Sequence, residues 1–462
     1  MQIMKIRGGK SLNGSIEASG AKNAITKLIV ASLISDQPCT FKNVPNITEV
    51  QITLDLCQEI GMQYEWTKET KTLNVVTPKL TSTYIPQRFS GANRIPILLI
   101  GALLGRTDDD IVIPTVGGCK IGKRPVDFHI KSLEILGATI ELRDMKKDGA
   151  YLAHAHKGLQ GAVVELPYPS VGATENTILA GCKAKGVTTI KNAAIEPEIL
   201  DLICFLQKLG VIINLDSERT ITITGTNKFY PTVHDVICDR IEVASYAMAA
   251  LSTKGRIFVK GAKQLDIMSF LKPYREINGG FTVREDGIEF FYQGPLSGGI
   301  SLETDVHPGF LTDWQQPFAV LLTQAHGESI IHETVYENRF GYTEILKDMG
   351  AKMSLFHTCL GEKFCRFKGK NFLHSLVISG PSILTGREIS IPDLRAGFAY
   401  VLAALIAESE TTLTNLHYLF RGYDDLVFKL KSLGAEVELL DTEVKGPVRL
   451  EEILLNKEPA NL

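Results

Sequence analysis

A short phrase returns six times along this chain: a leucine, isoleucine or methionine, then Gly-Ala or a close variant, then a pair of residues that favour strands. Successive copies are 76, 73, 70, 70 and 84 residues apart, and their glycines are Gly61, Gly137, Gly210, Gly280, Gly350 and Gly434. A glycine directly after a helix is the expected left-handed cap, because a residue without Cβ enters that region at little cost. So regular a recurrence indicates that one supersecondary unit is used six times.

The rest of the unit repeats as well. Roughly 20 residues before each glycine, a gap that fits one loop and one helix, stands a short β-branched strand. These strands are 39–41, 111–113, 188–190, 256–259, 329–331 and 411–413. Before each strand lies a helix rich in alanine and leucine that is apolar nearly all round, which indicates burial. These helices are 22–34, 93–104, 173–184, 241–252, 312–324 and 394–407.

The length of 462 residues favours two domains of three units each. The strand Met4-Lys5-Ile6 precedes the first buried helix and must pair elsewhere, so the N-terminal segment is expected to join the second half of the chain. We predict an α/β fold with one domain over residues 22–236 and a second over 1–21 and 237–462.

Composition excludes several classes of function. The chain is 44% hydrophobic and 22% charged, with net charge −3, which gives no reason to expect nucleic acid or an acidic membrane surface as a partner. No apolar run reaches the roughly 18 residues that span a bilayer. No signal peptide is visible, and eight cysteines without paired spacing favour reduced thiols in a cytoplasm.

Metal and cofactor sites are not expected. His154 and His156 alternate as in a strand, which would place both rings on one face, but no third ligand is evident. Short glycine pairs lack the strand-then-helix context of a dinucleotide site.

Cys119 differs from the other cysteines, because it lies in a glycine-rich loop beside Lys120, Lys123 and Arg124. These cations favour a thiolate and also suit a phosphate. The residues alone leave open that a loop cysteine beside basic residues is incidental.

Cations stand where the buried helices are expected to begin. Lys22, Arg94, Arg240 and Arg395 oppose the helix dipole there, so they indicate a bound anion more strongly than a single Asp or Ser, which is first interpreted as an N-cap. The second helices are expected to begin near Arg124, Glu196 with Glu198, Arg339 and Arg421.

Several multi-residue motifs carry a family resemblance that runs from about Ile6 to Val437. They are Ser19-Gly20-Ala21-Lys22-Asn23-Ala24, Gly117-Gly118-Cys119 followed by Ile121-Gly122 and Arg124-Pro125-Val126-Asp127, Ser170-Val171-Gly172-Ala173-Thr174, Glu333-Thr334-Val335 followed by Glu337-Asn338-Arg339-Phe340, Asp393-Leu394-Arg395-Ala396, and Arg421-Gly422-Tyr423. With them the chain resembles the UDP-N-acetylglucosamine 1-carboxyvinyltransferases, a family of enolpyruvyl transferases. The resemblance implies a two-domain inside-out α/β barrel of six βαβαββ repeats, three per domain, with the active site in the cleft between the domains.

The resemblance also implies a reaction and its residues. The enolpyruvyl group of phosphoenolpyruvate would pass to the 3-hydroxyl of UDP-N-acetylglucosamine with release of phosphate, without metal or cofactor, in the first committed step of peptidoglycan precursor synthesis. Cys119 would protonate the methylene carbon, Asp313 would take or orient the hydroxyl proton, and Asn23 and Arg395 would order the reacting centre. Lys22, Arg124 and Arg421 would hold phosphoenolpyruvate. The sugar nucleotide would contact Arg94, Arg124, Pro125, Val126, Asp127, Phe128, Ser170, Val171, Asp313 and Val335.

Four positions depart from the family pattern, and they bear on the acceptor more than on the donor. Pro96 indicates a shifted helix start, Trp314 replaces a typical methionine, and Tyr168 and Ile195 stand where basic residues are usual. An enolpyruvyl transferase for another nucleotide or nucleotide sugar, and a catalytically silent nucleotide-binding paralogue, therefore stay open as hypotheses. The Gly-Gly-Cys loop argues against shikimate 3-phosphate as the acceptor. Residues 441–462 have no functional interpretation.

Overall fold

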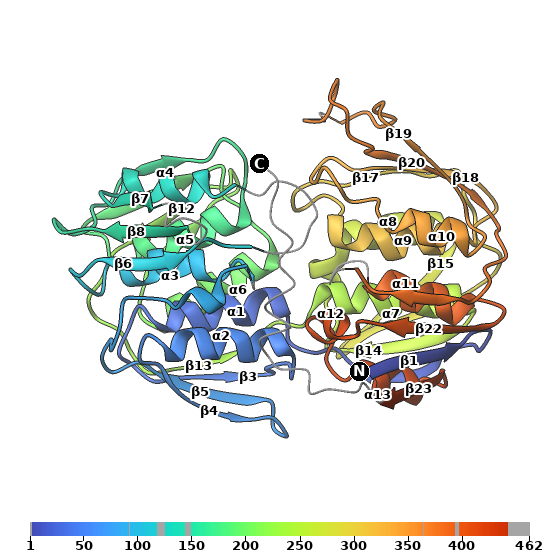
Figure 1. Ribbon diagram of the computed structural model, residues 1–462, viewed down its shortest axis with the longest axis horizontal. Coiled ribbons are helices and arrows are strands. Elements are labelled where there is room, and N and C mark those ends of the chain that lie inside the picture. The colour runs from blue at the N-terminus through green and yellow to red at the C-terminus, as the bar shows by residue number, and fades with distance from the viewer. Residues whose placement is uncertain are drawn as a thin grey trace. The chain divides into compact units, whose positions relative to one another are not determined.

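The structure is a computed structural model that describes residues 2–91, 93–117, 125–143, 149–363, 365–392 and 397–441 (Figure 1). Three predicted site residues, Cys119, Arg124 and Arg395, lie outside these ranges, as do residues 442–462. The described residues divide into two compact units. One contains the described residues between 20 and 237 and is called the 20–237 unit. The other contains residues 2–19 and the described residues between 238 and 441, and is called the 238–441 unit.

Each unit holds three sheets of one plan, which repeats with the six sequence units. The strand after each buried helix pairs in parallel with a strand or bridge on one side and antiparallel with a further strand on the other. These central strands are β3 (Cys39–Lys42), β6 (Ile111–Pro114), β10 (Val187–Lys191), β14 (Arg256–Lys260), β18 (Gly327–His332) and β22 (Glu410–Thr414), so the six predicted strands are confirmed. Their parallel neighbours are β13 (Thr232–Asp235), β9 (Val163–Glu165), β2 (Asn13–Glu17), β17 (Ser301–Glu303), β21 (Glu388–Ser390) and, for β6, the bridge at Tyr84. The antiparallel strands are β1 (Gln2–Arg7), β4 (Gln63–Thr67), β5 (Thr72–Val76), β7 (Thr139–Arg143), β8 (Ala150–His154), β11 (Ile212–Leu215), β12 (Ile221–Thr224), β15 (Gly279–Arg284), β16 (Gly287–Tyr292), β19 (Lys352–Phe356), β20 (Ser375–Gly380) and β23 (Glu436–Asp441).

The predicted buried helices are present, and each packs on the sheet of its own repeat. They are α1 (Lys22–Ser32), α3 (Pro96–Leu103), α5 (Val171–Gly181), α7 (Arg240–Ser252), α9 (Gln315–Leu322) and α11 (Gly397–Ile406). Every residue of α3 and α9 is buried, as a helix that is apolar nearly all round requires, although α9 also buries Gln315 and Gln316 in its first turn. The other helices are α2 (Thr48–Gln58), α4 (Asp127–Ile135), α6 (Pro197–Lys208), α8 (Met268–Glu276), α10 (Thr343–Asp348), α12 (His417–Phe420) and α13 (Leu426–Ser432), with 3-10 turns η1 (Gln87–Phe89), η2 (Gln264–Ile267) and η3 (Thr312–Trp314).

The recurring glycines close the second helices, with one exception. Gly61, Gly137, Gly210, Gly350 and Gly434 all have φ between 94° and 115°. In the fourth copy Asn278, with φ 72°, makes the turn and Gly280 lies inside β15, so the choice of Gly280 as the turn glycine is wrong. Asparagine tolerates this conformation because its short side chain bonds locally, and here Asn278 Nδ2 donates to Pro295 O at 3.0 Å.

The N-terminal strand completes the last repeat. β1 pairs antiparallel with both β22 and β23, in the place that a later strand of the same repeat takes in the other sheets. A buried network fixes the chain that follows: Lys429 Nζ donates to Glu242 Oε1 at 2.6 Å and to Ser19 Oγ at 2.7 Å. Residues 2–19 therefore belong to the 238–441 unit.

Each unit has its own hydrophobic cluster. In the 238–441 unit α7, α9 and α11 contact one another, and in the 20–237 unit α3 contacts both α1 and α5. The polar helix starts are therefore held by rigid, buried elements. Closure of the sheets into barrels stays a prediction. Within the described ranges, every helix is too short or too polar to span a bilayer.

Candidate active site

Lys22 and Asn23 open α1, as predicted. The preceding residue, Ala21, is extended and offers no side-chain cap, so N–H groups of the first turn face outward. Thr26 Oγ1 donates to Lys22 O at 3.1 Å and Lys27 Nζ donates to Asn23 O at 2.9 Å. A half-buried cation thus shares a turn with the positive end of a helix, an arrangement that suits an anion.

Arg94 lies two residues before α3, because the helix begins at Pro96 and not at Asn93 as predicted. Proline suits a first-turn position, where its missing N–H costs nothing. Asn93 is buried; its Oδ1 accepts from Ile95 N at 3.0 Å, whereas its Nδ2 has no hydrogen-bond partner among the described residues.

Two predicted nucleotide-binding segments come together where α4 packs against α5. Asp127 begins α4 after Val126, and Ser170 caps α5 by accepting from Ala173 N at 3.4 Å. Gly172 permits the approach, since a Cβ there would come within 2.9 Å of the His129 ring. Asp127 Oδ1 is buried without a partner among the described residues; buried polar atoms are normally satisfied, so a polar ligand is a candidate partner.

The 20–237 unit contains a cluster of three buried acids: Glu175, Glu196 and Glu198. They lie close enough for the charges of Glu196 and Glu198 to affect the pKa of Glu175, and Lys27 Nζ is 3.9 Å from Glu175 Oε1. Burial raises the pKa of Glu175 to about 7; Lys27 opposes this shift, and Glu198 and Glu196 add to it. This acid cluster neighbours the turn that carries Lys22 and Asn23, because Lys27 contacts both.

Replacing Glu175 with glutamine should make stability less dependent on pH. The pKa of this carboxyl is near 4.5 in the unfolded chain and about 7 in the folded protein. The wild type therefore loses stability as the pH rises from 4.5 to 7, and this carboxyl causes no further loss above pH 7. The stability gain of Glu175→Gln over wild type should therefore grow by about 3 kcal/mol from pH 4.5 to pH 7.5. Urea unfolding at both pH values checks this, with the exposed Glu134→Gln on α4 as control. An equal gain at both values would contradict the raised pKa.

Asp313 lies in η3 of the 238–441 unit and is buried in an ion pair with Arg339. Arg339 Nη2 donates to Asp313 Oδ1 and also to Thr312 O at 3.2 Å, and Arg339 Nε donates to Thr312 Oγ1 at 3.2 Å. Arg339 thereby orients the carboxylate through Nη2 while it also holds the neighbouring Thr312.

The same network reaches Val335. Thr312 Oγ1 donates to Glu333 Oε2 at 2.8 Å, and Glu333 Oε1 accepts from Val335 N at 2.8 Å and Tyr336 N at 3.0 Å. Burial raises the pKa of Glu333, while the positive charge of Arg339 opposes that shift. Two predicted site residues, Asp313 and Val335, are therefore held by one set of hydrogen bonds.

Trp314 is a core residue beside Asp313. Its ring packs edge-on against Phe270 and Phe310, its Nε1 donates to Arg240 O at 3.3 Å, and the Arg240 guanidinium lies 5.7 Å from the ring centre. Arg240 begins α7 as predicted.

Arg421 directly follows α12 and lies five residues before α13, so its predicted place at the start of a second helix is wrong. Arg339 likewise precedes α10, which begins at Thr343. The charge of Arg421 adds to burial in lowering the pKa of His417.

The family described as EPSP synthase (3-phosphoshikimate 1-carboxyvinyltransferase) matches residues 6–430. The chain belongs to this family. It is 62% identical over 443 residues to the UDP-N-acetylglucosamine 1-carboxyvinyltransferase of Protochlamydia amoebophila, covering 96% of this chain and 95% of that protein. It is 54% identical to the Chlamydia pneumoniae protein of the same name, covering 96% of each.

Solved structures of enolpyruvyl transferases confirm the fold of this EPSP synthase family member. The enolpyruvyl transferase NikO from Streptomyces tendae superposes with a TM-score of 0.82 at 23% identity, covering 95% of this chain and 98% of that one. EPSP synthase from Acinetobacter baumannii gives 0.72 at 16% identity, covering 96% of this chain and all of that one. The predicted α/β fold class is confirmed.

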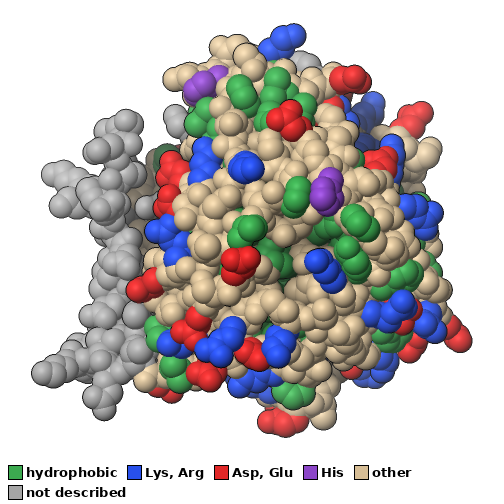
Figure 2. Space-filling view, turned by 90° about the vertical axis from the view of Figure 1, so that its right-hand side faces the viewer, with side chains coloured by type: hydrophobic (Ala, Val, Ile, Leu, Met, Phe, Trp, Pro, Cys, Tyr) green, Lys and Arg blue, Asp and Glu red, His purple; other side chains and the backbone are tan. Residues whose placement is uncertain are grey.

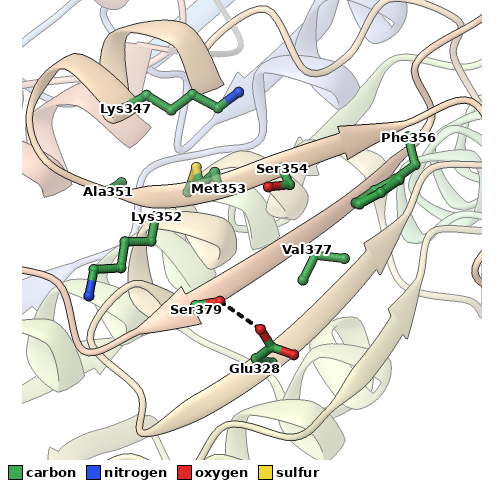
Figure 3. Close-up of a pocket in the computed structure, with 9 residues that line it drawn as sticks. All are labelled: Glu328, Lys347, Ala351, Lys352, Met353, Ser354, Phe356, Val377 and Ser379. Carbon is green, nitrogen blue, oxygen red and sulfur yellow. Dashed lines mark hydrogen bonds between the residues drawn. The ribbon is translucent and has the colours of Figure 1, made fainter.

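A surface pocket of about 700 Å³ in this family member has none of the predicted site residues in its lining (Figure 3). Residues of β18, β19 and β20, with Lys347 of α10 and Ala351, line it, and Ser379 Oγ donates there to Glu328 Oε1 at 3.0 Å. On the face in Figure 2, basic and acidic side chains are interspersed without a field of one sign. That pattern agrees with small, local anion sites.

Proposed function

We propose that the chain is a UDP-N-acetylglucosamine 1-carboxyvinyltransferase, which transfers the enolpyruvyl group of phosphoenolpyruvate to the 3-hydroxyl of the sugar and releases phosphate. The 62% identity to a protein of that name, over 96% of this chain, carries this proposal. The reaction is the first committed step of peptidoglycan precursor synthesis and thus serves cell wall biogenesis. A cytoplasmic location belongs to the proposal, and the free thiols of Cys39, Cys57, Cys182, Cys204, Cys238, Cys359 and Cys365 support it.

The donor carries a phosphate and a carboxylate close together, so several cations are needed to hold it. We assign Lys22, Arg124 and Arg421 to this role. The position of Lys22 in the uncapped first turn of α1 supports its assignment, because helix N–H groups add to its charge.

We assign contacts with the acceptor to residues of both units. Arg94, Arg124, Pro125, Val126, Asp127, Phe128, Ser170 and Val171 would contact the nucleotide and sugar from the 20–237 unit, and Asp313 and Val335 from the 238–441 unit. The convergence of α4 and α5 supports the first group, since it brings Asp127 and Ser170 to adjoining helix starts.

The proposed transfer reaction needs a general acid that donates a proton and a general base that accepts one. In the addition step the 3-oxygen bonds to the carbon that bears the phosphate, Cys119 gives its proton to the methylene carbon, and Asp313 takes the hydroxyl proton. In the elimination step that added methyl group loses a proton and the C–O bond to phosphate breaks. Arg339 supports the role of Asp313 because its Nη2 donates to one carboxylate oxygen and thereby fixes the orientation of the carboxylate. Asn23 and Arg395 would order the reacting centre.

The decisive experiment measures phosphate release from phosphoenolpyruvate with a panel of acceptors. UDP-N-acetylglucosamine should support turnover, whereas shikimate 3-phosphate and free UMP should not. Turnover with another nucleotide sugar alone would transfer the proposal to a variant acceptor, which the neutral Tyr168 and Ile195 would then explain. No release with any acceptor, from protein that still binds UDP-N-acetylglucosamine, would indicate a silent paralogue.

A further inference from the structure

Two histidines and two cysteines of the 238–441 unit direct their ligand atoms at one point. His332 ends β18, Cys359 and Cys365 follow β19, and His374 directly precedes β20. One ligand atom of each lies within 4.8 Å of the other three, and Cys359 Sγ is 3.3 Å from His374 Nε2. His332, Cys365 and His374 are buried.

The hydrogen bonds of the two rings fix which nitrogen faces this point. His332 Nδ1 bonds to Glu303 Oε2 at 3.0 Å, and His374 Nδ1 bonds to Phe372 O at 2.7 Å. In each ring Nδ1 is therefore occupied, and Nε2 is the nitrogen available to a metal beside the cysteines. His332 Nε2 is fully buried without a hydrogen-bond partner among the described residues. A carboxylate or carbonyl behind each imidazole is the usual support of a metal-binding histidine.

We propose that His332, Cys359, Cys365 and His374 bind one zinc ion as a closed, structural Cys2His2 site. Ligand atoms of a tetrahedral zinc lie roughly 3.3–3.8 Å from one another, given Zn–N and Zn–S bonds of about 2.1 and 2.3 Å. The four atoms need only small side-chain adjustments to meet this geometry. Two thiolates and two imidazoles also match the donor preference of zinc over calcium or magnesium.

The surrounding loop is shaped to hold these ligands. Glu303 accepts from Glu362 N at 2.9 Å and from Lys363 N at 3.0 Å, so the carboxylate behind His332 also anchors the segment between the two cysteines. At Gly361 a Cβ would come within 2.1 Å of His332 Nδ1, so glycine alone fits there. Phe367 N donates to Cys365 Sγ at 3.4 Å, which stabilises charge on that sulfur.

The zinc site adjoins the network of Asp313. The residue after His332 is Glu333, which accepts hydrogen bonds from Thr312 Oγ1 and Val335 N. The residue after Cys365 is Arg366, which donates through Nη2 to Val335 O. A metal that fixes His332 and Cys365 would therefore steady Val335 from two sides. Sequence spacing does not indicate this site, because the ligands come from two strand ends and a loop.

A second group, Asp110, His154 and His156, serves as a contrast. Its two histidine rings stack with their centres 3.9 Å apart, and Asp110 lies close enough to be a third ligand that the sequence did not reveal, but Asp110 and His156 are exposed. No proposal rests on this group, and it offers a control within the same chain.

The test is the zinc content of full-length protein, purified without a polyhistidine tag under reducing conditions and measured by inductively coupled plasma mass spectrometry. Wild type should carry about one zinc per chain, and the double variant Cys359→Ser/Cys365→Ser should carry at least about tenfold less. Cys204→Ser, which removes an exposed thiol elsewhere, and His154→Gln/His156→Gln should both keep the zinc.

Cobalt tests the ligand set even if the serine variant fails to fold. Wild type reconstituted with Co²⁺ should show the thiolate charge-transfer and strong ligand-field bands of a tetrahedral site, and Cys359→His should keep the metal with a weaker charge-transfer band. The proposal is overturned by reduced wild type that neither contains zinc nor takes up Co²⁺, or by a Cys359–Cys365 disulfide that persists in the protein purified under reducing conditions. Zinc that is lost only with His154 and His156 would overturn it as well. None of these readouts depends on the proposed transferase activity.

Discussion

Cys119→Ser should abolish covalent labelling by fosfomycin and lower turnover by at least about a hundredfold, the usual scale for losing a general acid. Fosfomycin is an epoxide that resembles phosphoenolpyruvate, and Lys22, Arg124 and Arg421 would hold its phosphonate beside the thiol. By their sequence proximity, Lys120, Lys123 and Arg124 would favour the thiolate, and the thiolate would be the nucleophile that opens the epoxide. Mass spectrometry of the labelled peptide and phosphate release measure the two effects.

The other cysteines provide the control. Burial raises the pKa of Cys39 to about 12 and that of Cys238 to about 11, and it raises those of Cys57 and Cys182 further still, so these thiols are poor nucleophiles. Cys204 is exposed and is the sensible competitor, so Cys204→Ser should keep both labelling and turnover.

Cys119→Asp should regain much of the turnover but resist labelling, because a carboxylic acid donates a proton yet is a weak nucleophile. Labelling of any other cysteine, or full activity in Cys119→Ser, would show that this thiol is incidental.

Much of the fold was predictable because the six units repeat the same local signals. A helix apolar all round, a β-branched strand and a glycine turn each follow from local chemistry, and their register agrees with the structure. Gly280 was mistaken for the turn because asparagine can take the left-handed conformation as well, and Asn278 does so. Such substitutions are invisible to a pattern that looks only for glycine.

The sequence predicted the site residues that stand at helix starts. It did not predict which side chains pair with one another across the site. Lys22, Arg240 and Ser170 stand at the predicted helix starts. The pairing of Arg339 with Asp313, and its link through Thr312 to Glu333, joins segments that are distant in sequence. The motif that contains Glu333 and Arg339 was the available signal, but it gave no partner for either side chain.

Arg339→Met should lower the free energy of unfolding by about 3–5 kcal/mol, because it removes one partner of a buried ion pair. The Arg339 side chain is fully buried, and its loss removes the ion-pair partner of Asp313 and two donors to Thr312. Arg256→Met is the matched control: its ion pair with Glu289 has a half-exposed arginine, so the expected cost is under about 1 kcal/mol. Urea unfolding measures the loss of unfolding free energy in both variants. Equal losses would show that burial does not make the Arg339–Asp313 ion pair more important for stability than the Arg256–Glu289 pair.

Asp313→Asn should separate chemistry from stability at the same pair. The amide oxygen can still accept from Arg339 Nη2, so the fold should lose less than in Arg339→Met, whereas turnover should fall by about 10²–10⁴-fold because an amide takes no proton. Binding of UDP-N-acetylglucosamine, measured by calorimetry, should change far less than turnover, since Val335 remains held by Glu333. If turnover and stability instead fell together in Asp313→Asn, with binding lost, Asp313 would be a structural partner of Arg339 and the base would have to be sought elsewhere.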